Sequence, residues 1–245
     1  MVSYPKAGRT WLRVMLDALG VHAEYTHFGA GVKDAQLIEE IRGNPLWCHG
    51  RTTLLLVRDP RDTLVSSFFQ ATKRRHVYAG DITAFVRDPR FGIEKLARWN
   101  LMWAELPLHQ QRFGLVTYEA LRSDPRAMLR GVVHFFGADR SDAAIDGAVE
   151  GADIDVMRAK EVSGAYTEKY GKALKPGDVA DRDSYKVRRG VVGGYRESLS
   201  EGDVAYCDET LARLDYWARL RVAGERFAVQ PALQRDPAHA GTSAP

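Results

Sequence analysis

The stretch MVSYPKAGRTWLR (residues 1–13) decides the fold, because it has the pattern of a strand, a tight loop and a helix. Met1 to Tyr4 end a short strand, and Pro5 to Arg9 make a loop that contains one glycine and one lysine. From Thr10 onward, apolar residues recur at helical spacing. A helix N-terminus beside a cation is suited to binding an anion.

Two interpretations of Lys6 stay open on these residues alone. The lysine either holds a phosphate or is a solvated charge, since many α/β proteins contain a strand, loop and helix of this kind. The pattern G-x-x-x-x-G-K-[ST] of ATP- and GTP-binding loops is absent, because Lys6 precedes Gly8. An ordinary ATP or GTP loop is therefore disfavoured.

A second unit of the same kind is RTTLLLVRDPRDTLVSSFFQATKRR (residues 51–75). Thr52 to Val57 form an apolar run with little alternation, as expected for a strand that is covered on both faces. Asp59 is placed to cap the following helix, and Pro60 suits its first position. Another cation, Arg58, lies at the turn.

A third unit, GLVTYEALRSDPRAMLRGVVHFFG (residues 114–137), predicts a strand over Leu115–Tyr118 and a helix from Pro125 that is capped by Asp124. Alternating strands and helices indicate a mainly parallel sheet, whose ligands bind at the carboxyl ends of the strands. Outside these units we expect a short strand at 22–28, helices at 34–42, 93–106 and about 201–219, and a polar loop without periodicity at 161–190. We expect the aromatic residues of the 93–106 helix to pack in the core.

Composition and charge narrow the classes of function. The chain has 245 residues, which suits one large α/β domain. Its 35 Lys and Arg residues against 32 Asp and Glu give too small an excess for a duplex-binding surface, so we expect no nucleic-acid partner. Cys48 and Cys207 cannot build a disulfide framework or a zinc cluster. Without a signal peptide or a long apolar run, we expect a cytoplasmic protein with no membrane insertion.

Four segments, in this order along the chain, resemble the cytosolic-type sulfotransferase family, which uses 3′-phosphoadenosine 5′-phosphosulfate (PAPS). SYPKAGRTW (residues 3–11) looks like that family's 5′-phosphosulfate loop, Y-P-K-S-G-T-T-W. VRDPRDTLVSS (57–67) looks like its 3′-phosphate segment. VTYEALRSDP (116–125) resembles its tyrosine-bearing strand and following helix. RRGVVGGY (188–195) resembles its R-K-G-x-x-G-D-W segment, which closes on the 3′-phosphate.

The resemblance covers Ser3 to about Arg219 and implies one α/β domain, with a central, mainly parallel sheet flanked by helices and a P-loop-like nucleotide-binding architecture. We place this sulfotransferase domain at residues 1–229. Residues 230–245, rich in Pro, Ala, Gly and Ser, predict a disordered tail.

The resemblance also implies which residues bind the nucleotide. Lys6 and the loop N–H groups would absorb the charge that grows on the departing phosphate oxygen. Departures from the pattern are Ala7 and Arg9, where the family has small hydroxyl residues, and Gly194–Tyr195, where it has Asp–Trp. The predicted nucleotide-binding residues are Lys6, Ala7, Gly8, Arg9, Thr10, Trp11, Arg58, Ser66, Tyr118, Arg188, Arg189 and Gly190.

A general base must take the proton of the acceptor hydroxyl or amine. The family usually supplies a histidine from a strand that ends in T-H, and YTHFG matches this at His27. His49 and a carboxylate such as Glu24 stay open as rivals. We expect the catalytic pair Lys6 and His27, a small-molecule acceptor, adenosine 3′,5′-bisphosphate (PAP) as the product nucleotide, and no metal.

Two other classes of function are kept. A P-loop-type NTPase or nucleotide kinase would use the LLLVRD strand, with Asp59 on Mg²⁺, although it lacks the GK[ST] loop. A non-catalytic nucleotide-binding protein of the same fold would bind tightly without turnover. Neither the acceptor nor the oligomeric state follows from the sequence.

Overall fold

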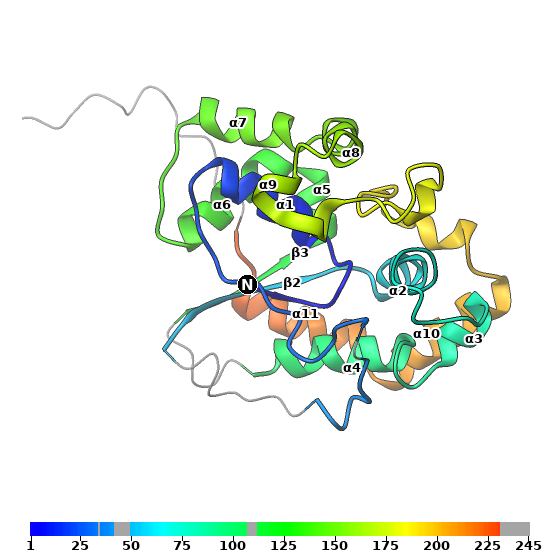
Figure 1. The fold of residues 1–245 in the computed structure, drawn as a ribbon. Coiled ribbons are helices and arrows are strands. Elements are labelled where there is room, and N and C mark those ends of the chain that lie inside the picture. Colours follow the sequence, from blue (N-terminus) through cyan, green and yellow to red (C-terminus); the bar gives the residue numbers. More distant parts are fainter. Residues whose placement is uncertain (34, 42–49, 107–111, 231–245) are drawn as a thin grey trace, which may run out of the picture.

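Three parallel strands form the centre of the fold in a computed structural model that describes residues 1–33, 35–41, 50–106 and 112–230 (Figure 1). Their order in the sheet is β1 (Val2–Ser3), β2 (Thr52–Val57), β3 (Arg112–Thr117). In this register Val2 lies opposite Leu55, and Val57 lies opposite Thr117. The predicted parallel α/β architecture is therefore confirmed.

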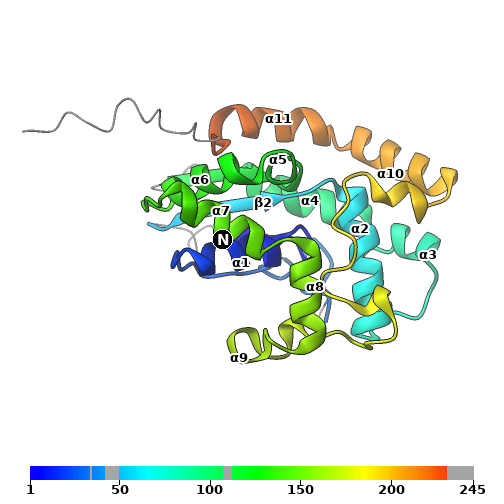
Figure 2. The ribbon, with the colours of Figure 1, turned by 90° about the horizontal axis from the view of Figure 1, so that it is seen from above.

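Helices cover both faces of the sheet, as the two views show (Figures 1 and 2). One face carries α1 (Arg9–Ala18), α6 (Pro125–Phe135) and α7 (Asp142–Gly151), and the other carries α2 (Pro60–Phe69), α4 (Ile93–Ala104) and α11 (Tyr216–Phe227). The remaining helices are α3 (Ile82–Arg87), α5 (Tyr118–Ser123), α8 (Ile154–Ser163), α9 (Thr167–Tyr170) and α10 (Glu201–Arg213).

Strand β2 divides the hydrophobic core in two. Leu54 and Leu56 join the cluster beneath α1, α6 and α7, whereas Leu55 and Val57 join the cluster on the α4 side. All four side chains are buried because successive residues of a strand point to opposite faces. The prediction of a strand covered on both faces is confirmed.

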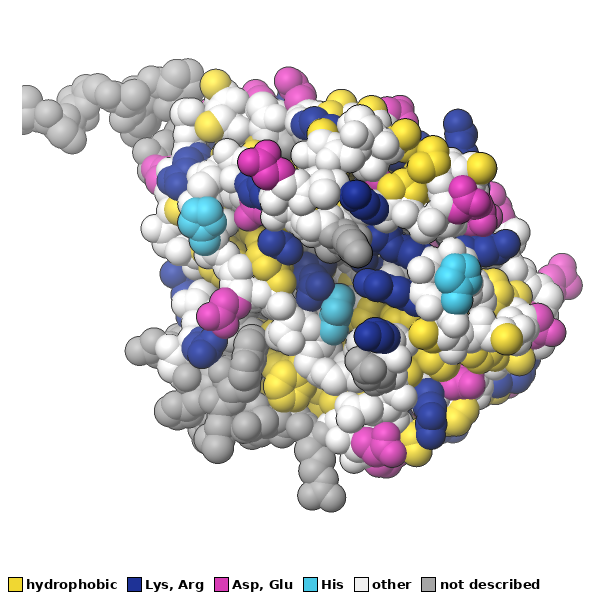
Figure 3. Space-filling model, in the orientation of Figure 1, with side chains coloured by type: hydrophobic (Ala, Val, Ile, Leu, Met, Phe, Trp, Pro, Cys, Tyr) yellow, Lys and Arg dark blue, Asp and Glu magenta, His cyan; other side chains and the backbone are white. Residues whose placement is uncertain are grey.

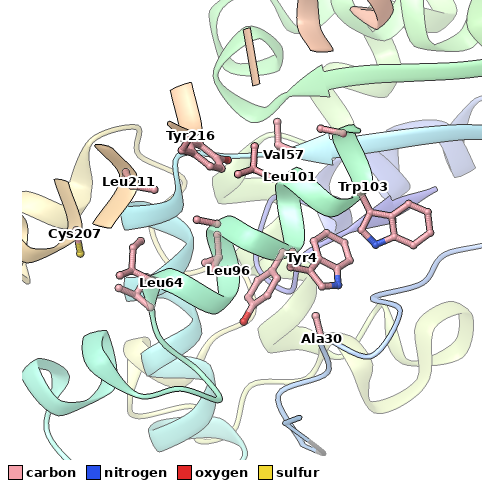
Figure 4. Packing of buried hydrophobic residues seen from close by; sticks show 14 of the residues in the cluster. Tyr4, Ala30, Val57, Leu64, Leu96, Leu101, Trp103, Cys207, Leu211 and Tyr216 are labelled. Atoms are coloured by element: carbon pink, nitrogen blue, oxygen red, sulfur yellow. The ribbon is translucent and has the colours of Figure 1, made fainter. Parts of the chain in front are cut away.

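The aromatic side chains of α4 fill the second cluster. Trp99 and Trp103 are fully buried, and the ring of Tyr4 meets Trp99 edge-on at a centroid distance of 5.6 Å. Figure 4 shows Tyr4, Leu96 and Trp103 within this cluster. These aromatic residues belong to the core, as predicted.

The local signals at helix starts are confirmed where short-range chemistry decides them. The Asp59 carboxylate accepts a hydrogen bond from the N–H of Arg61, with Pro60 in the first helical turn of α2. Asp124 caps α6 in the same way. Helix α2 continues into a π-helical turn, Gln70–Arg74.

Two predictions near the N-terminus are wrong. In the segment 22–28 only Thr26 pairs, as a single bridge with Val2, because β1 ends before Pro5, which has no N–H to donate. Within 34–42, the described residues 35–41 form turns, with the Glu40 carboxylate accepting from the N–H of Leu37. A single turn of this kind is too short to form a stable helix, because the first turn of a helix is costly to form.

Three predicted boundaries also differ. The helix expected at 201–219 is two helices, α10 and α11, separated at Asp215, which adopts a φ of 50° that aspartate tolerates better than most residues. Tyr118 begins α5 instead of ending β3. The segment 161–190 begins within α8 and includes α9 and short 3₁₀ turns at Gly171–Leu174 and Arg182–Ser184.

No helix in the described parts of the chain has the length and apolarity needed to cross a membrane. The cytoplasmic location stays a prediction. The predicted tail beyond Gln230 lies outside the described residues.

Candidate functional site

A pocket opens at the carboxyl ends of the strands, where the loops after β1, β2 and β3 meet residues 186–195. Its empty space is about 1010 Å³, part of which opens to solvent. Lys and Arg side chains gather around a hollow on the face shown in Figure 3. Eleven of the twelve predicted nucleotide-binding residues, and His27, line this pocket: Lys6, Gly8, Arg9, Thr10, Trp11, His27, Arg58, Ser66, Tyr118, Arg188, Arg189 and Gly190.

The twelfth predicted residue, Ala7, is not part of the pocket wall. Its side chain is buried, and its N–H donates to the carbonyl of Tyr4 at 3.3 Å.

Lys6 lies at the base of the pocket in a left-handed conformation with a φ of 71°. Its Nζ donates to the carbonyl of Lys186 at 3.2 Å and to Gln70 Oε1 at 3.5 Å. Burial, followed by the charges of Lys186 and Arg74, lowers the pKa of Lys6 well below its usual value. Such a cation gains from an anion placed beside it.

Gly8 allows the loop of residues 5–9, which we call the Lys6 loop, to approach Tyr118. Its φ is 100°, and a Cβ at this position would lie 2.4 Å from Cδ2 of Tyr118. Helix α1 begins at the next residue, and Arg9 and Thr10, the first residues of its first turn, line the pocket. Both the backbone and the ring therefore require glycine here.

Gly8→Ala should lower the melting temperature, because the left-handed backbone and the Tyr118 clash together cost about 1–3 kcal/mol. For a chain of this size that is a drop of several degrees, measured by circular dichroism. Gly147→Ala in α7 is the matched control, since a Cβ there meets no atom within 4 Å. A Gly8→Ala protein as stable as the wild type would contradict this account of the loop.

Arg58, from the loop after β2, is a second cation that lines the pocket. Its Nη2 donates to the carbonyl of Val191 at 2.8 Å and lies 3.5 Å from Asp62 Oδ2. The guanidinium stacks on the Tyr118 ring at 4.5 Å, and its Nε is buried with no hydrogen-bond partner among the described residues. Arg58 thus forms an ion pair with Asp62, and one buried donor is still free for a ligand.

Residues 186–195, which we call the strap, cover one side of the pocket. The Glu161 carboxylate accepts from the N–H groups of Lys186 and Val187 at 2.6 and 2.9 Å. The Asp62 carboxylate accepts from those of Gly193 and Tyr195 at 2.7 and 2.9 Å. Two buried acids therefore hold the strap by its backbone. Neither was predicted as a site residue.

The side chains of the strap reach both the pocket and its rim. The Arg188 guanidinium stacks on Phe69 at 4.2 Å and pairs with Asp183 at 3.4 Å. Arg189 pairs with Glu197 at the exposed edge. The Tyr118 hydroxyl donates to the carbonyl of Gly190 at 3.0 Å, so Tyr118 contacts the pocket and also ties the strap to α5.

His27 lies in the pocket in a form that can accept a proton. Its Nδ1 donates to the carbonyl of Ser3 at 2.9 Å, because a carbonyl oxygen can only accept. In the neutral ring Nε2 is then the acceptor. Burial and the charge of Arg9 lower the pKa of His27 to about 3, so the ring is neutral.

One rival for the role of base, Glu24, does not line the pocket. The Glu24 side chain is 76% exposed and pairs with Arg51 at 2.7 Å, away from the pocket-lining residues. His49 lies outside the described residues.

Besides Asp62, sequence reasoning missed several residues that line the pocket. Lys186 lines the pocket, where burial and neighbouring arginines lower its pKa to about 7. In the sequence, only its position two residues before Arg188 could have indicated that it belongs to the site. Apolar residues at the start of α8, Ile154 and Met157, form another wall, and their helix carries no motif.

The arrangement gives no support to the NTPase alternative. The Asp59 carboxylate, which that alternative needs on Mg²⁺, caps α2 and pairs with Arg61 at 2.7 Å outside the pocket wall. Among the described residues no group of three His, Cys, Asp or Glu side chains is arranged to hold a metal ion. The expectation that the reaction needs no metal stays a prediction.

Comparison with known structures shows the same fold in sulfotransferases. The structure of mouse sulfotransferase SULT7A1 complexed with PAP matches with a TM-score of 0.61 and 16% identity, over 92% of this chain and 86% of that one. Retinol dehydratase with androsterone and the inactive cofactor PAP, and with retinol and PAP, match with a TM-score of 0.53 and 18% identity. Each of these matches covers 66% of this chain and 47% of that one.

Comparison of sequences identifies the family. No curated protein matches the chain significantly. The family model described as the sulfotransferase domain matches residues 45–216, which include Arg58, Tyr118 and the strap. That range is more than half of the chain, and its α/β fold agrees with the solved structures. The chain therefore belongs to the sulfotransferase domain family.

Proposed function

We propose that the pocket binds PAPS and that the chain moves its sulfuryl group to a hydroxyl or amine of a small-molecule acceptor. The observation that carries the proposal is the convergence, in one pocket, of the Lys6 loop, the Arg58 position and a neutral histidine. The chain is a PAPS-dependent sulfotransferase by its family. The roles of its individual residues are the proposal.

The pocket residues fit the nucleotide at both of its ends. Lys6 and the N–H groups of the first turn of α1 are suited to the 5′-phosphosulfate. Arg58, with its free buried Nε, is suited to the 3′-phosphate together with Ser66 and Arg188. Trp11 and Tyr118, whose centroids are 5.8 Å apart, border the space between these ends and would contact the adenine.

The proposed step is an in-line transfer. The acceptor oxygen forms a bond to sulfur while the bond from sulfur to the bridging phosphate oxygen breaks, and that bond's electron pair stays on PAP. Lys6 stabilises the negative charge that grows on the departing oxygen. The acceptor proton passes to Nε2 of His27 and from there to solvent. The products are the sulfated acceptor, PAP and a proton.

Nucleotide binding should raise the pKa of His27 from about 3, because the phosphosulfate charge favours the imidazolium that burial and Arg9 disfavour. A base that titrates nearer neutral pH is better suited to take the proton. The measurement is an NMR titration of the His27 ring with and without PAP, with the resonance assigned by its loss in His27→Asn. A His27 pKa that PAP does not change would count against its place beside the phosphosulfate.

The proposed function is tested by incubating the protein with ³⁵S-labelled PAPS and a panel of phenols, alcohols and amines. We expect labelled products and release of PAP in equal amounts. Calorimetry should show binding of PAP and none of ATP with Mg²⁺. Tight PAP binding without turnover of any acceptor would favour the non-catalytic alternative, and failure to bind PAP would overturn the proposal.

Residues 1–229 are proposed as one domain. The hydrophobic clusters on the two faces of the sheet use residues from Met1 to Val229, so the Lys6 loop and the family-matched region share one core. A small-molecule acceptor is supported by the retinol and androsterone in the retinol dehydratase structures.

A further inference from the structure

The cations of the pocket fall into two groups according to their carboxylate partners. Arg58, Arg188 and Arg189 each pair with an acid, whereas Lys6, Arg9 and Lys186 have no carboxylate within ion-pair distance among the described residues. Arg122 also lines the pocket, where it is exposed and stacks on Trp11. The unpaired, partly buried cations thus lie around the Lys6 loop.

Arg9 and His27 line the same pocket. The charged or titratable groups that act on its pKa are Arg13 and Tyr25, and Arg9 in turn lowers the pKa of His27. The Arg9 side chain therefore acts on the proposed base within the same pocket.

Lys186 lies near the same histidine. Its charge lowers the pKa of His27, and its own pKa is lowered to about 7 by burial, then by Arg74 and Arg9. The Glu161 carboxylate raises the pKa of Lys186 in part but forms no ion pair with it among the described residues; it accepts from strap N–H groups and pairs with Arg74 at 3.8 Å. Arg9 Nη1 is likewise buried with no hydrogen-bond partner in the described parts of the chain.

The positive charge of these cations exceeds the negative charge that the phosphosulfate brings to the Lys6 loop. The phosphosulfate carries about two negative charges, which favour the protonated forms of Lys6 and Lys186 although burial lowers their pKa values. With Arg9 these make three side-chain cations, beside the positive end of α1. Lys6 is assigned to the departing phosphate oxygen. Arg9 and Lys186 therefore leave about one positive charge beside His27, where the acceptor binds.

We propose that the acceptor is itself an anion, whose hydroxyl or amine lies at His27 while its carboxylate, phosphate or sulfate group binds Arg9 and Lys186. This proposal rests on the proposed function, because it places the acceptor in the same pocket. A neutral acceptor of equal shape would leave the two cations buried and unpaired. The site thus discriminates by charge.

The test compares matched acceptors on the PAPS-loaded enzyme. We expect kcat/KM for 4-hydroxyphenylpropionate to exceed that for 4-hydroxyphenylpropionamide by about 10- to 100-fold, the range for a charged hydrogen bond. Phenols with an aryl phosphate or aryl sulfate group, each with a neutral analogue, extend the comparison. Calorimetry on PAP-loaded protein should give the same preference, as the ratio of the affinities for the charged and the neutral acceptor.

Variants assign the preference to the two cations. Arg9→Thr and Lys186→Met should each reduce the ratio of charged to neutral acceptor several-fold. Arg13→Met is the matched control, because it removes a guanidinium one helical turn from Arg9 and outside the pocket wall, so the ratio should persist.

The outcomes separate this proposal from the proposed function. If neutral acceptors bind and react as well as charged ones, or if no charged phenol binds PAP-loaded protein, the anionic acceptor is overturned while PAP binding preserves the sulfotransferase site. A protein that does not bind PAP overturns both.

Discussion

Lys6→Met lowers kcat by about 10²- to 10³-fold, the effect of removing one donor to charge that develops in a transition state. In the Lys6 loop, the Nζ of Lys6 has no carboxylate partner among the described residues. Methionine has a similar unbranched stem, and the φ of 71° is equally unfavourable for both residues. The loss thus reports the charge and not the backbone.

The measurement is single-turnover release of PAP, which separates chemistry from binding. Lys73→Met is the matched control, because Lys73 is exposed, pairs with Asp181 at 3.8 Å and lies outside the pocket wall. It should keep wild-type turnover. A Lys6→Met enzyme within threefold of the wild type would remove Lys6 from the chemical step.

Arg58→Met weakens PAP binding by about 10- to 100-fold, because a charged hydrogen bond to phosphate is worth about 1.5–3 kcal/mol. The effect should be confined to nucleotides with a 3′-phosphate, so AMP binding changes less than threefold. The PAP affinity of Arg58→Lys should fall between those of the wild type and Arg58→Met, since lysine keeps the charge but not the planar pair of donors. Calorimetry with PAP and with AMP gives the ratio of the two affinities for each protein.

Folding is controlled separately in this experiment. Arg58 also stacks on Tyr118 and bonds the Val191 carbonyl, so its loss can loosen the strap. Arg61→Met removes a neighbouring guanidinium that pairs with Asp59 and Asp208 outside the pocket wall, and it should leave the ratio of PAP to AMP affinity unchanged. Equal weakening of PAP and AMP by Arg58→Met would place the 3′-phosphate elsewhere.

Sequence predicted those parts of the fold that local chemistry decides. The cap at Asp59 and the apolar run of β2 are each complete within a few residues. The failures depend on distant partners or on one unusual residue. The segment 22–28 could not extend as a strand because its neighbour β1 is only two residues long, and Asp215 breaks a periodic helix through its backbone angle.

The same division holds for the candidate site. Motifs predicted Lys6 and Arg58 because both lie beside recognisable turns. Asp62 and Glu161 act on backbone N–H groups 131 and 25 residues away, and no spacing in the sequence links an acid to such a partner. Lys186 was missed because its segment has no periodicity.

The strap also affects the heat of nucleotide binding. Lys6 donates to the Lys186 carbonyl and Arg58 Nη2 to the Val191 carbonyl, so a phosphate oxygen that takes either of these bonds replaces a peptide oxygen. Where that exchange occurs, the released enthalpy is smaller than the new bond alone would give, whereas a bond to the free Nε of Arg58 replaces none. Most of the selectivity comes from the difference in charge between a phosphate and a peptide group.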